Sequence, residues 1–184
     1  KAVTLVVAVL VVVGGIAALL RRGSDPLDGR GRLDIRHLNE DYDGVTEALK
    51  AAILSKKAFK QFQKERKTRE KHRDKAERRR VYVLNFHGDI RAAAVASLRE
   101  EVTAVLTVAQ AEDEVVLRLE SAGGLVHSYG LAAAQLLRIR DRRIKLTVTV
   151  DKVAASGGYM MACVADHIVA APFAVLGSIG VIAQ

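Results

Sequence analysis

One serine in this chain lies where a catalytic nucleophile would be expected. Ser156 follows the alternating, β-branched stretch Ile144–Val150 and directly precedes the small, apolar stretch Gly157–Val164. The first pattern predicts a half-buried strand and the second predicts a helix. A serine between them would expose its hydroxyl beside the unpaired N–H groups of the first helical turn, which can stabilise an oxyanion. The same position is also the usual one for a helix N-cap, so the serine alone leaves both interpretations open.

A second unit of strand, glycine turn and helix lies upstream. The stretch Glu114–Leu119 predicts a buried strand, and His127–Arg140 predicts a helix. Gly123 and Gly124 lie between them. Glycines let the backbone approach a ligand closely, although a tight turn is the simpler role for such a pair. Two successive units, one with backbone donors and one with a serine, favour a catalytic site.

Four segments of the chain together carry a family resemblance. They are VYVLNFHGDI at Val81–Ile90, SAGG at Ser121–Gly124, DKVAASGGYMMACVAD at Asp151–Asp166, and GSIGV at Gly177–Val181. In this order and spacing they resemble the signal peptide peptidase A family of serine proteases, and within it the SohB-type membrane proteases. The family usually has a proline where this chain has Ala122, a change that leaves both glycines in place. The resemblance covers Val81–Gln184, with a weaker likeness before it.

The resemblance implies a fold and a set of roles. The family's fold is an α/β superhelical fold that is shared with caseinolytic protease and the crotonases. By position, the resemblance implies that Ser156 is the nucleophile and that Ser178 orients the general base. It also implies oxyanion donors at Gly157 and at Gly123 or its neighbour Gly124.

The general base in this family is a lysine that lies well downstream of the serine, beyond Gln184. A lysine in an apolar pocket has a lowered pKa, so its neutral amine can accept the serine proton near neutral pH. We therefore expect an N-terminal fragment of a protease that is inactive alone. Lys145 and Lys152 are expected to be solvated, and His87 and His167 are expected to have structural roles.

The first residues predict a membrane anchor. Between Ala2 and Leu20 only Thr4 is polar, and a helix of that length would span about 27 Å, close to the bilayer's hydrocarbon thickness. A cleaved signal peptide is the competing reading, but Arg21 and Arg22 follow without a clear small-residue cleavage site. We expect a single-pass protein of the cell inner membrane. The arginines favour a cytoplasmic protease domain and the family analogy favours an external one, so the side stays open.

The segment after the anchor is strongly basic. From Lys56 to Arg80 there are thirteen Lys and Arg against four Asp and Glu, a net charge of +9 where the whole chain carries +8. No aromatic residue lies between Gln63 and Arg80 to stack on bases, so we expect no nucleic-acid partner. A solvated helix or linker is predicted, with attraction to anionic lipid headgroups as a lesser role.

These patterns divide the chain into three parts. Residues 2–20 are the predicted transmembrane anchor, 21–80 a linker and basic helical segment, and 81–184 a serine protease domain whose C-terminal part is missing. In the second part, Leu27–Tyr42 predicts a linker and Val45–Phe62 a helix. In the third, Val95–Ala109 predicts an amphipathic helix that packs on the sheet. The single cysteine, Cys163, is expected in the core, and the scattered histidines predict no metal site and no cofactor.

The expected function is that of a membrane-anchored serine endopeptidase with a Ser/Lys dyad. It would cleave signal peptides or other apolar, membrane-derived polypeptides, bound as an added strand near Gly124–His127. The expected partners are a polypeptide substrate, membrane lipid and, by resemblance, further copies of the chain. Two alternatives remain. One is a catalytically incomplete membrane scaffold that keeps the fold for oligomerisation, and the other is a crotonase-type acyl-coenzyme A enzyme.

Overall fold

The computed structural model describes residues 33–73 and 79–180. The predicted anchor at 2–20 lies outside these residues, and none of the helices within them is long and apolar enough to cross a membrane. The elements follow in the order α2 (Leu38–Ile53), α3 (Lys56–Arg73), β1 (Val81–Gly88), α4 (Val95–Val108), β2 (Glu114–Ser121), α5 (Val126–Asp141), β3 (Lys145–Val150), β4 (Val153–Ala155), α6 (Gly157–Ala162), β5 (His167–Ala170) and β6 (Val175–Gly177).

Two helices precede the sheet. α2 begins at Leu38, inside the stretch predicted as a linker, and the single helix predicted over Val45–Phe62 is divided between α2 and α3. Contacts between the two helices are local: Glu47 accepts hydrogen bonds from Gln63 at 3.1 Å and from Arg66 at 2.6 Å. The basic segment is helical as far as Arg73, in agreement with the helical alternative.

Every strand pairing in the sheet is parallel. β1 pairs with β2 along its whole length, from Val81 with Glu114 to Gly88 with Ser121. On the opposite edge of β2, β3 pairs with the first five residues and β4 pairs with the last. β5 and β6 then pair with the outer edges of β3 and β4. The strand order is β5-β3-β2-β4-β6, with β1 beside β2.

The sheet changes direction between β3 and β4. Only Asp151 and Lys152 separate these strands. The first part of β2 pairs with β3, and its last residue pairs with β4. The same step recurs between β5 and β6, where Ala174 N–H donates to Ala171 O at 3.0 Å across the turn. β4 and β6 therefore form a short continuation of the sheet beyond its carboxyl edge, and this continuation carries Ser156.

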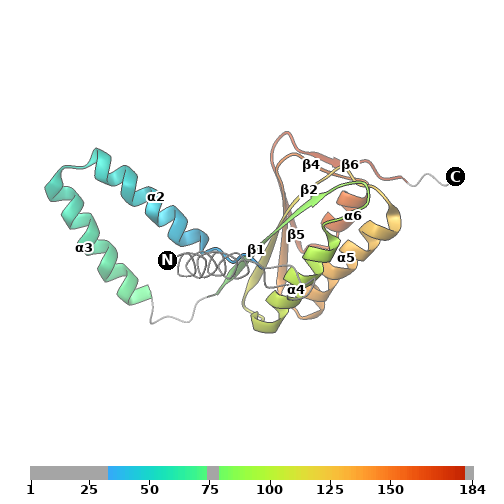
Figure 1. The fold of residues 1–184 in the computed structure, drawn as a ribbon, viewed down its shortest axis with the longest axis horizontal. Helices are drawn as coiled ribbons and strands as arrows, with labels where there is room; N and C mark the ends of the chain where they lie inside the picture. Colours follow the sequence, from blue (N-terminus) through green and yellow to red (C-terminus); the bar gives the residue numbers. More distant parts are fainter. Residues whose placement is uncertain (1–32, 74–78, 181–184) are drawn as a thin grey trace, which may run out of the picture. The chain divides into compact units, whose positions relative to one another are not determined.

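Helices α4, α5 and α6 cover one face of the sheet (Figure 1). β2 alternates accordingly: Val115, Leu117 and Leu119 are buried, whereas Arg118 is exposed on the other face. The sequence pattern predicted a buried strand, and the structure shows that the residues of one face are buried while those of the other are partly buried or exposed. α4 packs with Leu98, Val102 and Val105 inward, as the predicted amphipathic pattern required. Parallel strands need such crossover helices, because the carboxyl end of one strand and the amino end of the next lie at opposite edges of the sheet.

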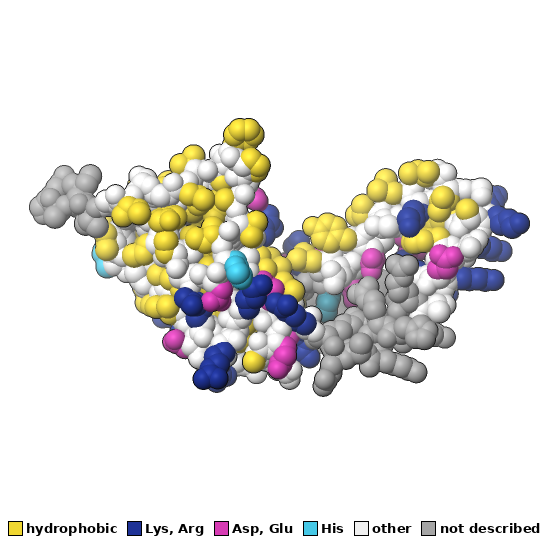
Figure 2. All heavy atoms as spheres, turned by 180° about the vertical axis from the view of Figure 1, so that it is seen from behind, with side chains coloured by type: hydrophobic (Ala, Val, Ile, Leu, Met, Phe, Trp, Pro, Cys, Tyr) yellow, Lys and Arg dark blue, Asp and Glu magenta, His cyan; other side chains and the backbone are white. Residues whose placement is uncertain are grey.

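Strands β5 and β6 are largely exposed. Hydrophobic side chains gather on the face of the sheet domain seen in Figure 2. The exposed apolar residues of this region include Ile168, Val169, Phe173, Val175 and Leu176. The architecture is thus α/β with a parallel sheet and helices on one face. This confirms the predicted fold class at that level, while the caseinolytic protease and crotonase superhelix stays a prediction.

Candidate active site

Four chain segments meet beyond the carboxyl ends of the parallel strands, which is where open α/β sheets bind their ligands. The loop after β1 contacts the glycine turn after β2, because Leu125 N–H donates to Ile90 O at 2.9 Å. The residue after β4 contacts the last residue of β6, because Ser156 N–H donates to Gly177 O at 2.8 Å. The topology therefore brings together the segments that the sequence had singled out separately.

Ser156 has an unusual backbone conformation. Its φ is 50° and its ψ is −118°, between β4 and the first residue of α6. A positive φ in a residue other than glycine costs of order 1–3 kcal/mol and clusters at functional sites. A serine on such a sharp strand-to-helix turn projects its hydroxyl away from the sheet, the arrangement of a nucleophile elbow. Ser156 does occupy the N-cap position of α6, where Met160 N–H donates to its carbonyl oxygen at 2.9 Å, but its side chain makes no capping hydrogen bond.

Gly123 lies directly against this serine. Its φ is +90°, and an added Cβ would lie 2.7 Å from Ala155 O, 2.7 Å from Ser156 Cβ and 2.8 Å from Gly157 N. Contacts that short are not found in folded proteins, so only glycine fits here. The glycine turn and the serine turn are therefore in contact, as expected if both belong to one site.

The three amides predicted to bind an oxyanion differ in their hydrogen bonding. Gly123 N–H donates to Ser121 Oγ at 3.0 Å. Gly124 N–H and Gly157 N–H donate to no acceptor in the part of the chain that the structure describes. Gly157 is also the first residue of α6, where helix geometry leaves the N–H groups unpaired. The amides of Gly124 and Gly157 are thus unpaired, with Gly157 itself buried, whereas the amide of Gly123 is used within the turn.

Behind the glycine turn lies a buried hydroxyl pair that the sequence reasoning missed. Tyr129 is fully buried on α5, and its hydroxyl lies 2.6 Å from Ser121 Oγ and donates to Asp89 O at 2.7 Å. Burial raises the pKa of Tyr129 above its ordinary value, so the phenol keeps its proton at neutral pH. The available signal was a tyrosine among alanines and leucines, six residues after Gly123.

Ser178 lies beside Ser156, directly after the neighbouring strand β6. Ala155 pairs with Gly177 in the register of β4 and β6, so the two serines follow paired residues. Gly177 and Ser178 both have positive φ, 106° and 52°, and Ser178 is exposed. The structure thus brings the two predicted serines together. The role of Ser178 toward a lysine stays a prediction.

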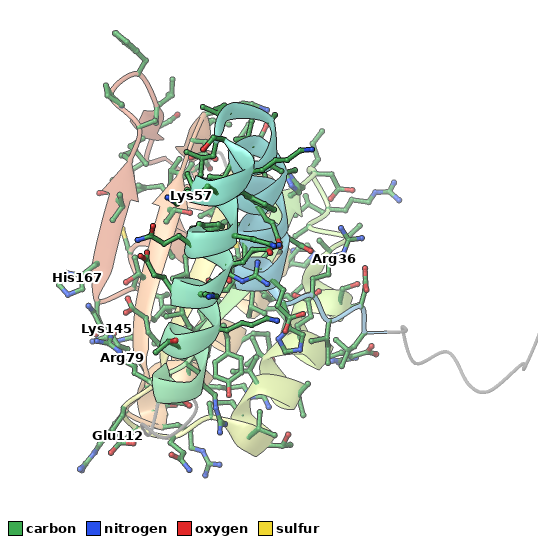
Figure 3. The ribbon with its side chains drawn as sticks, turned by 90° about the vertical axis from the view of Figure 1, so that its left-hand side faces the viewer. Arg36, Lys57, Arg79, Glu112, Lys145 and His167 are labelled. Carbon is green, nitrogen blue, oxygen red and sulfur yellow. The ribbon has the colours of Figure 1, made fainter. Side chains whose placement is uncertain are left out.

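Two lysines and one histidine of the sheet domain are engaged or directed elsewhere. Lys152 is ion-paired with Glu120 at 3.0 Å, and Lys145 with Glu114 at 3.6 Å. His167 lies on the edge strand β5, paired with the amino end of β3, and its ring projects outward (Figure 3). Within the described residues, the hydroxyl of Ser156 has no hydrogen-bond partner that could act as its base.

Two expectations near the site are wrong. Cys163, expected in the core, is exposed, because α6 ends at Ala162 and the following turn faces solvent. No strand lies over Gly124–His127, where a strand edge was expected, because β2 ends at Ser121 and α5 begins at Val126.

An open hollow at the other end of the sheet does not belong to this site. It is lined by residues around the start of β3, among them Lys145, Arg140 and Asp166. Arg140 and Asp166 are already paired with each other at 3.1 Å. None of the residues that line it comes from the turns that carry Gly123, Ser156 or Ser178.

The fold and the site define a class of protein: a parallel α/β domain with a serine on a strained strand-to-helix turn, set against a glycine turn with unpaired amides. The family models agree with this class. Residues 1–136 match "Peptidase family S49 N-terminal" and residues 138–184 match "Peptidase family S49". The chain belongs to peptidase family S49.

Its relatives include proteins named as probable SohB proteases. The chain is 50% identical to "Probable protease SohB" of Haemophilus influenzae, in an alignment covering 98% of this chain and 54% of that protein. It is 48% identical to the SohB protein of Buchnera aphidicola subsp. Schlechtendalia chinensis, over 83% of this chain and 54% of that protein. The resemblance to SohB-type proteases is therefore confirmed. The chain spans about half the length of the curated relatives it matches.

Among solved structures, the chain is similar to a ClpP1 mutant from Listeria monocytogenes. The match has a TM-score of 0.35 and 14% sequence identity, and covers 47% of this chain and 45% of that one. This similarity is too low to define the fold, which the strand pairing defines directly.

Proposed function

We propose that this chain is the nucleophile-bearing part of a serine endopeptidase. The observation that carries the proposal is the placement of Ser156, held at positive φ against Gly123 and directly before Gly157, whose amide is unpaired. The unpaired amide of Gly124 belongs to the next residue of the same glycine turn. A hydroxyl beside two backbone donors is the arrangement that acyl transfer requires. Membership in a peptidase family supports the same reaction class.

In this mechanism Ser156 Oγ attacks the carbonyl carbon of the scissile peptide bond, and its proton passes to the general base. Gly124 N–H and Gly157 N–H donate to the oxyanion of the tetrahedral intermediate. The C–N bond then breaks, and the base returns the proton to the leaving amine. Water hydrolyses the acyl-enzyme by the same steps, which restores the serine.

We propose that the base is a lysine outside the described residues, as the family resemblance implies. Its amine would accept the proton of the Ser156 hydroxyl, which has no other hydrogen-bond partner within the described residues. Ser178, beside Ser156 and exposed, would hydrogen-bond that amine and direct its lone pair toward the nucleophile. Lys152 is not proposed for this role, since it is paired with Glu120 and its side chain is 72% exposed.

We further propose that the protein is anchored in the inner membrane by residues 2–20, and that its substrates are signal peptides or other apolar membrane-derived polypeptides. The uninterrupted apolar run supports the anchor. The exposed apolar side chains Leu125 and Val126, next to the glycine turn, support a preference for apolar substrates. Contact with lipid and assembly with further copies of the chain belong to the same proposal.

The test is peptidase activity of the full-length protein in detergent, on fluorogenic peptides with apolar side chains. Wild type should cleave them, and Ser156→Ala should lose at least about 10³-fold of that activity, because the nucleophile is gone. A Ser156→Ala variant as active as wild type would refute the proposal.

The second candidate is a membrane scaffold that keeps the fold without catalysis. It is favoured by one observation, that no base reaches Ser156 within the described residues. A folded full-length protein with no activity on several peptides across the pH range would support the scaffold.

A further inference from the structure

Tyr129 contacts both of the segments that carry the unpaired amides. It lies in the first turn of α5, fully buried, with its ring edge-on to Phe86 at a centroid distance of 6.4 Å. Its hydroxyl reaches the end of β2, and its ring reaches the turn after β4. One side chain thus bridges the glycine turn and the serine turn from inside the domain.

The hydrogen bonds around its hydroxyl have a fixed order. A carbonyl oxygen only accepts, so the phenol proton is donated to Asp89 O at 2.7 Å. At 2.6 Å the Ser121 hydroxyl must then donate to the phenol oxygen, since its alternative acceptor, Gly88 O, lies at 3.4 Å. Ser121 Oγ keeps its lone pairs for Gly123 N–H, at 3.0 Å. The chain of bonds therefore runs from the glycine turn through two hydroxyls to the loop after β1.

The ring of Tyr129 also contacts the serine turn, at Gly157. An added Cβ on Gly157 would lie 2.8 Å from both Cβ and Cδ2 of Tyr129, so the backbone of Gly157 rests directly on the tyrosine side chain. Gly157 follows the nucleophile and carries one of the unpaired amides. The position of the ring therefore sets how far this amide extends toward the glycine turn.

We propose that Tyr129, acting through Ser121, is a positioning residue that sets the spacing of the two amides that bind the oxyanion. The inference rests on the proposed function. Amide donors stabilise an oxyanion only when they lie within about 2.7–3.1 Å of it, and a misplacement of about 1 Å can cost about 10²-fold in rate. A buried, fully satisfied hydroxyl pair is well suited to hold such a spacing, because neither group exchanges with water.

The direct test is Tyr129→Phe in the full-length protein. The ring stays against Gly157, but the hydroxyl that holds Ser121 and the glycine turn is lost. We expect kcat to fall roughly 10- to 100-fold, with KM within about twofold, because the amides act on the transition state rather than on the bound peptide. A fluorophosphonate, which reacts with an activated serine, should label Ser156 more slowly in the same proportion.

Thr147→Val is the matched control. Thr147 is buried on β3, and its hydroxyl donates to Glu114 Oε1 at 2.7 Å. Glu114 is the first residue of β2, at the opposite end of that strand from the glycine turn. The substitution also removes one buried hydroxyl, so its melting temperature should fall about as far as that of Tyr129→Phe. Its kcat should stay within about twofold of wild type. Equal losses of kcat in the two variants would indicate a merely structural role for Tyr129 and overturn the proposal.

A double-mutant cycle with Ser121→Ala tests whether the two hydroxyls act as a unit. Ser121→Ala removes the acceptor of Gly123 N–H, and Tyr129→Phe removes the phenol oxygen that orients this acceptor. If both act on the same bond, the double variant should lose no more than about twofold beyond the less active single variant. Losses in kcat that multiply would show that Tyr129 does not act through Ser121 and would overturn this part of the inference.

Amide exchange separates failure of the inference from failure of the proposed function. In Tyr129→Phe, the amides of the glycine turn should exchange about 2- to 12-fold faster, the factor that corresponds to the net strength of one hydrogen bond. Active wild type, inactive Ser156→Ala and unchanged kcat in Tyr129→Phe would overturn the inference alone. If wild type cleaves nothing, the proposed function fails, and exchange decides: faster exchange supports positioning by Tyr129, and unchanged exchange overturns it.

Discussion

Replacement of Gly123 by alanine should damage the protein in a way that the structure makes quantitative. The added Cβ would lie 2.7 Å from Ala155 O and 2.7 Å from Ser156 Cβ, about 0.7 Å inside the 3.4 Å at which ordinary contact begins. Two of the three nearest atoms belong to backbone, so no side-chain rotation relieves the overlap. Alanine at φ +90° adds a further strain, because L-residues rarely adopt that conformation.

These two effects can be added. Left-handed backbone costs alanine about 1–2 kcal/mol, and overpacking in a closed interior costs about 1–3 kcal/mol. The free energy of unfolding should therefore fall by about 2–5 kcal/mol, which corresponds to roughly 4–20 °C in melting temperature for a domain of this size. A shift of the serine turn by about 0.7 Å should in addition lower kcat roughly 10- to 100-fold.

The assay compares Gly123→Ala with Gly130→Ala, in the full-length protein, by thermal unfolding and peptide cleavage. Gly130 lies inside α5, and a Cβ there would have no neighbour within 4 Å. That control should gain up to about 1 kcal/mol, because alanine favours a helix over glycine, and its kcat should not change. A Gly123→Ala variant with the melting temperature and kcat of wild type would refute the close contact between the two turns.

Three further outcomes follow from the same structure. Leu136→Ala, at a fully buried position of α5, should lower the free energy of unfolding by about 2–5 kcal/mol, whereas Leu131→Ala, 48% exposed on that helix, should stay within about 0.5 kcal/mol in urea titrations. Backbone N–H donors, that of Gln110 foremost, hold the pKa of Asp113 below its usual value. Its contribution to stability should thus be complete above the unfolded pKa of about 3.9 and lost as the pH falls further, and Asp113→Asn should flatten that part of the pH profile. Lys152→Ala should keep peptide cleavage within about threefold of wild type, and a loss of 10³-fold would identify Lys152 as the base after all.

The main elements and the candidate nucleophile could be predicted because their patterns are long or chemically specific. The alternation in Ile144–Val150 and the apolar spacing in Val95–Ala109 each extend over several residues, so local pattern and tertiary packing agree. The order of the glycine turn and Ser156 placed both at the carboxyl edge of one sheet, where parallel strands bring their ends together.

Other features could not be predicted, because they arise only from tertiary packing. β4 and β6 have three residues each, too few for any periodicity. The break between α2 and α3 falls at Leu54 and Ser55, with neither glycine nor proline to mark it. The hydroxyl pair of Ser121 and Tyr129 depends on two side chains from different elements that come together beside Gly88, which has no side chain to separate them. The exposure of Cys163 depends on where a six-residue helix ends.

The positive φ of Ser156 also could not be predicted from the sequence. A serine in that region is rare, and only the pairing of β4 with β6 on one side and the approach of Gly123 on the other explain how it is held there. The strain is then a property of the fold around the residue rather than of the residue itself.

Covalent labelling shows whether Ser156 is an activated nucleophile. Full-length protein is incubated with a fluorophosphonate, digested and analysed by mass spectrometry, beside Ser156→Ala. We expect one phosphonyl adduct on the peptide that contains Ser156, and no adduct in the variant. Labelling of another serine with equal speed in both proteins, or peptide cleavage that persists in Ser156→Ala, would contradict it.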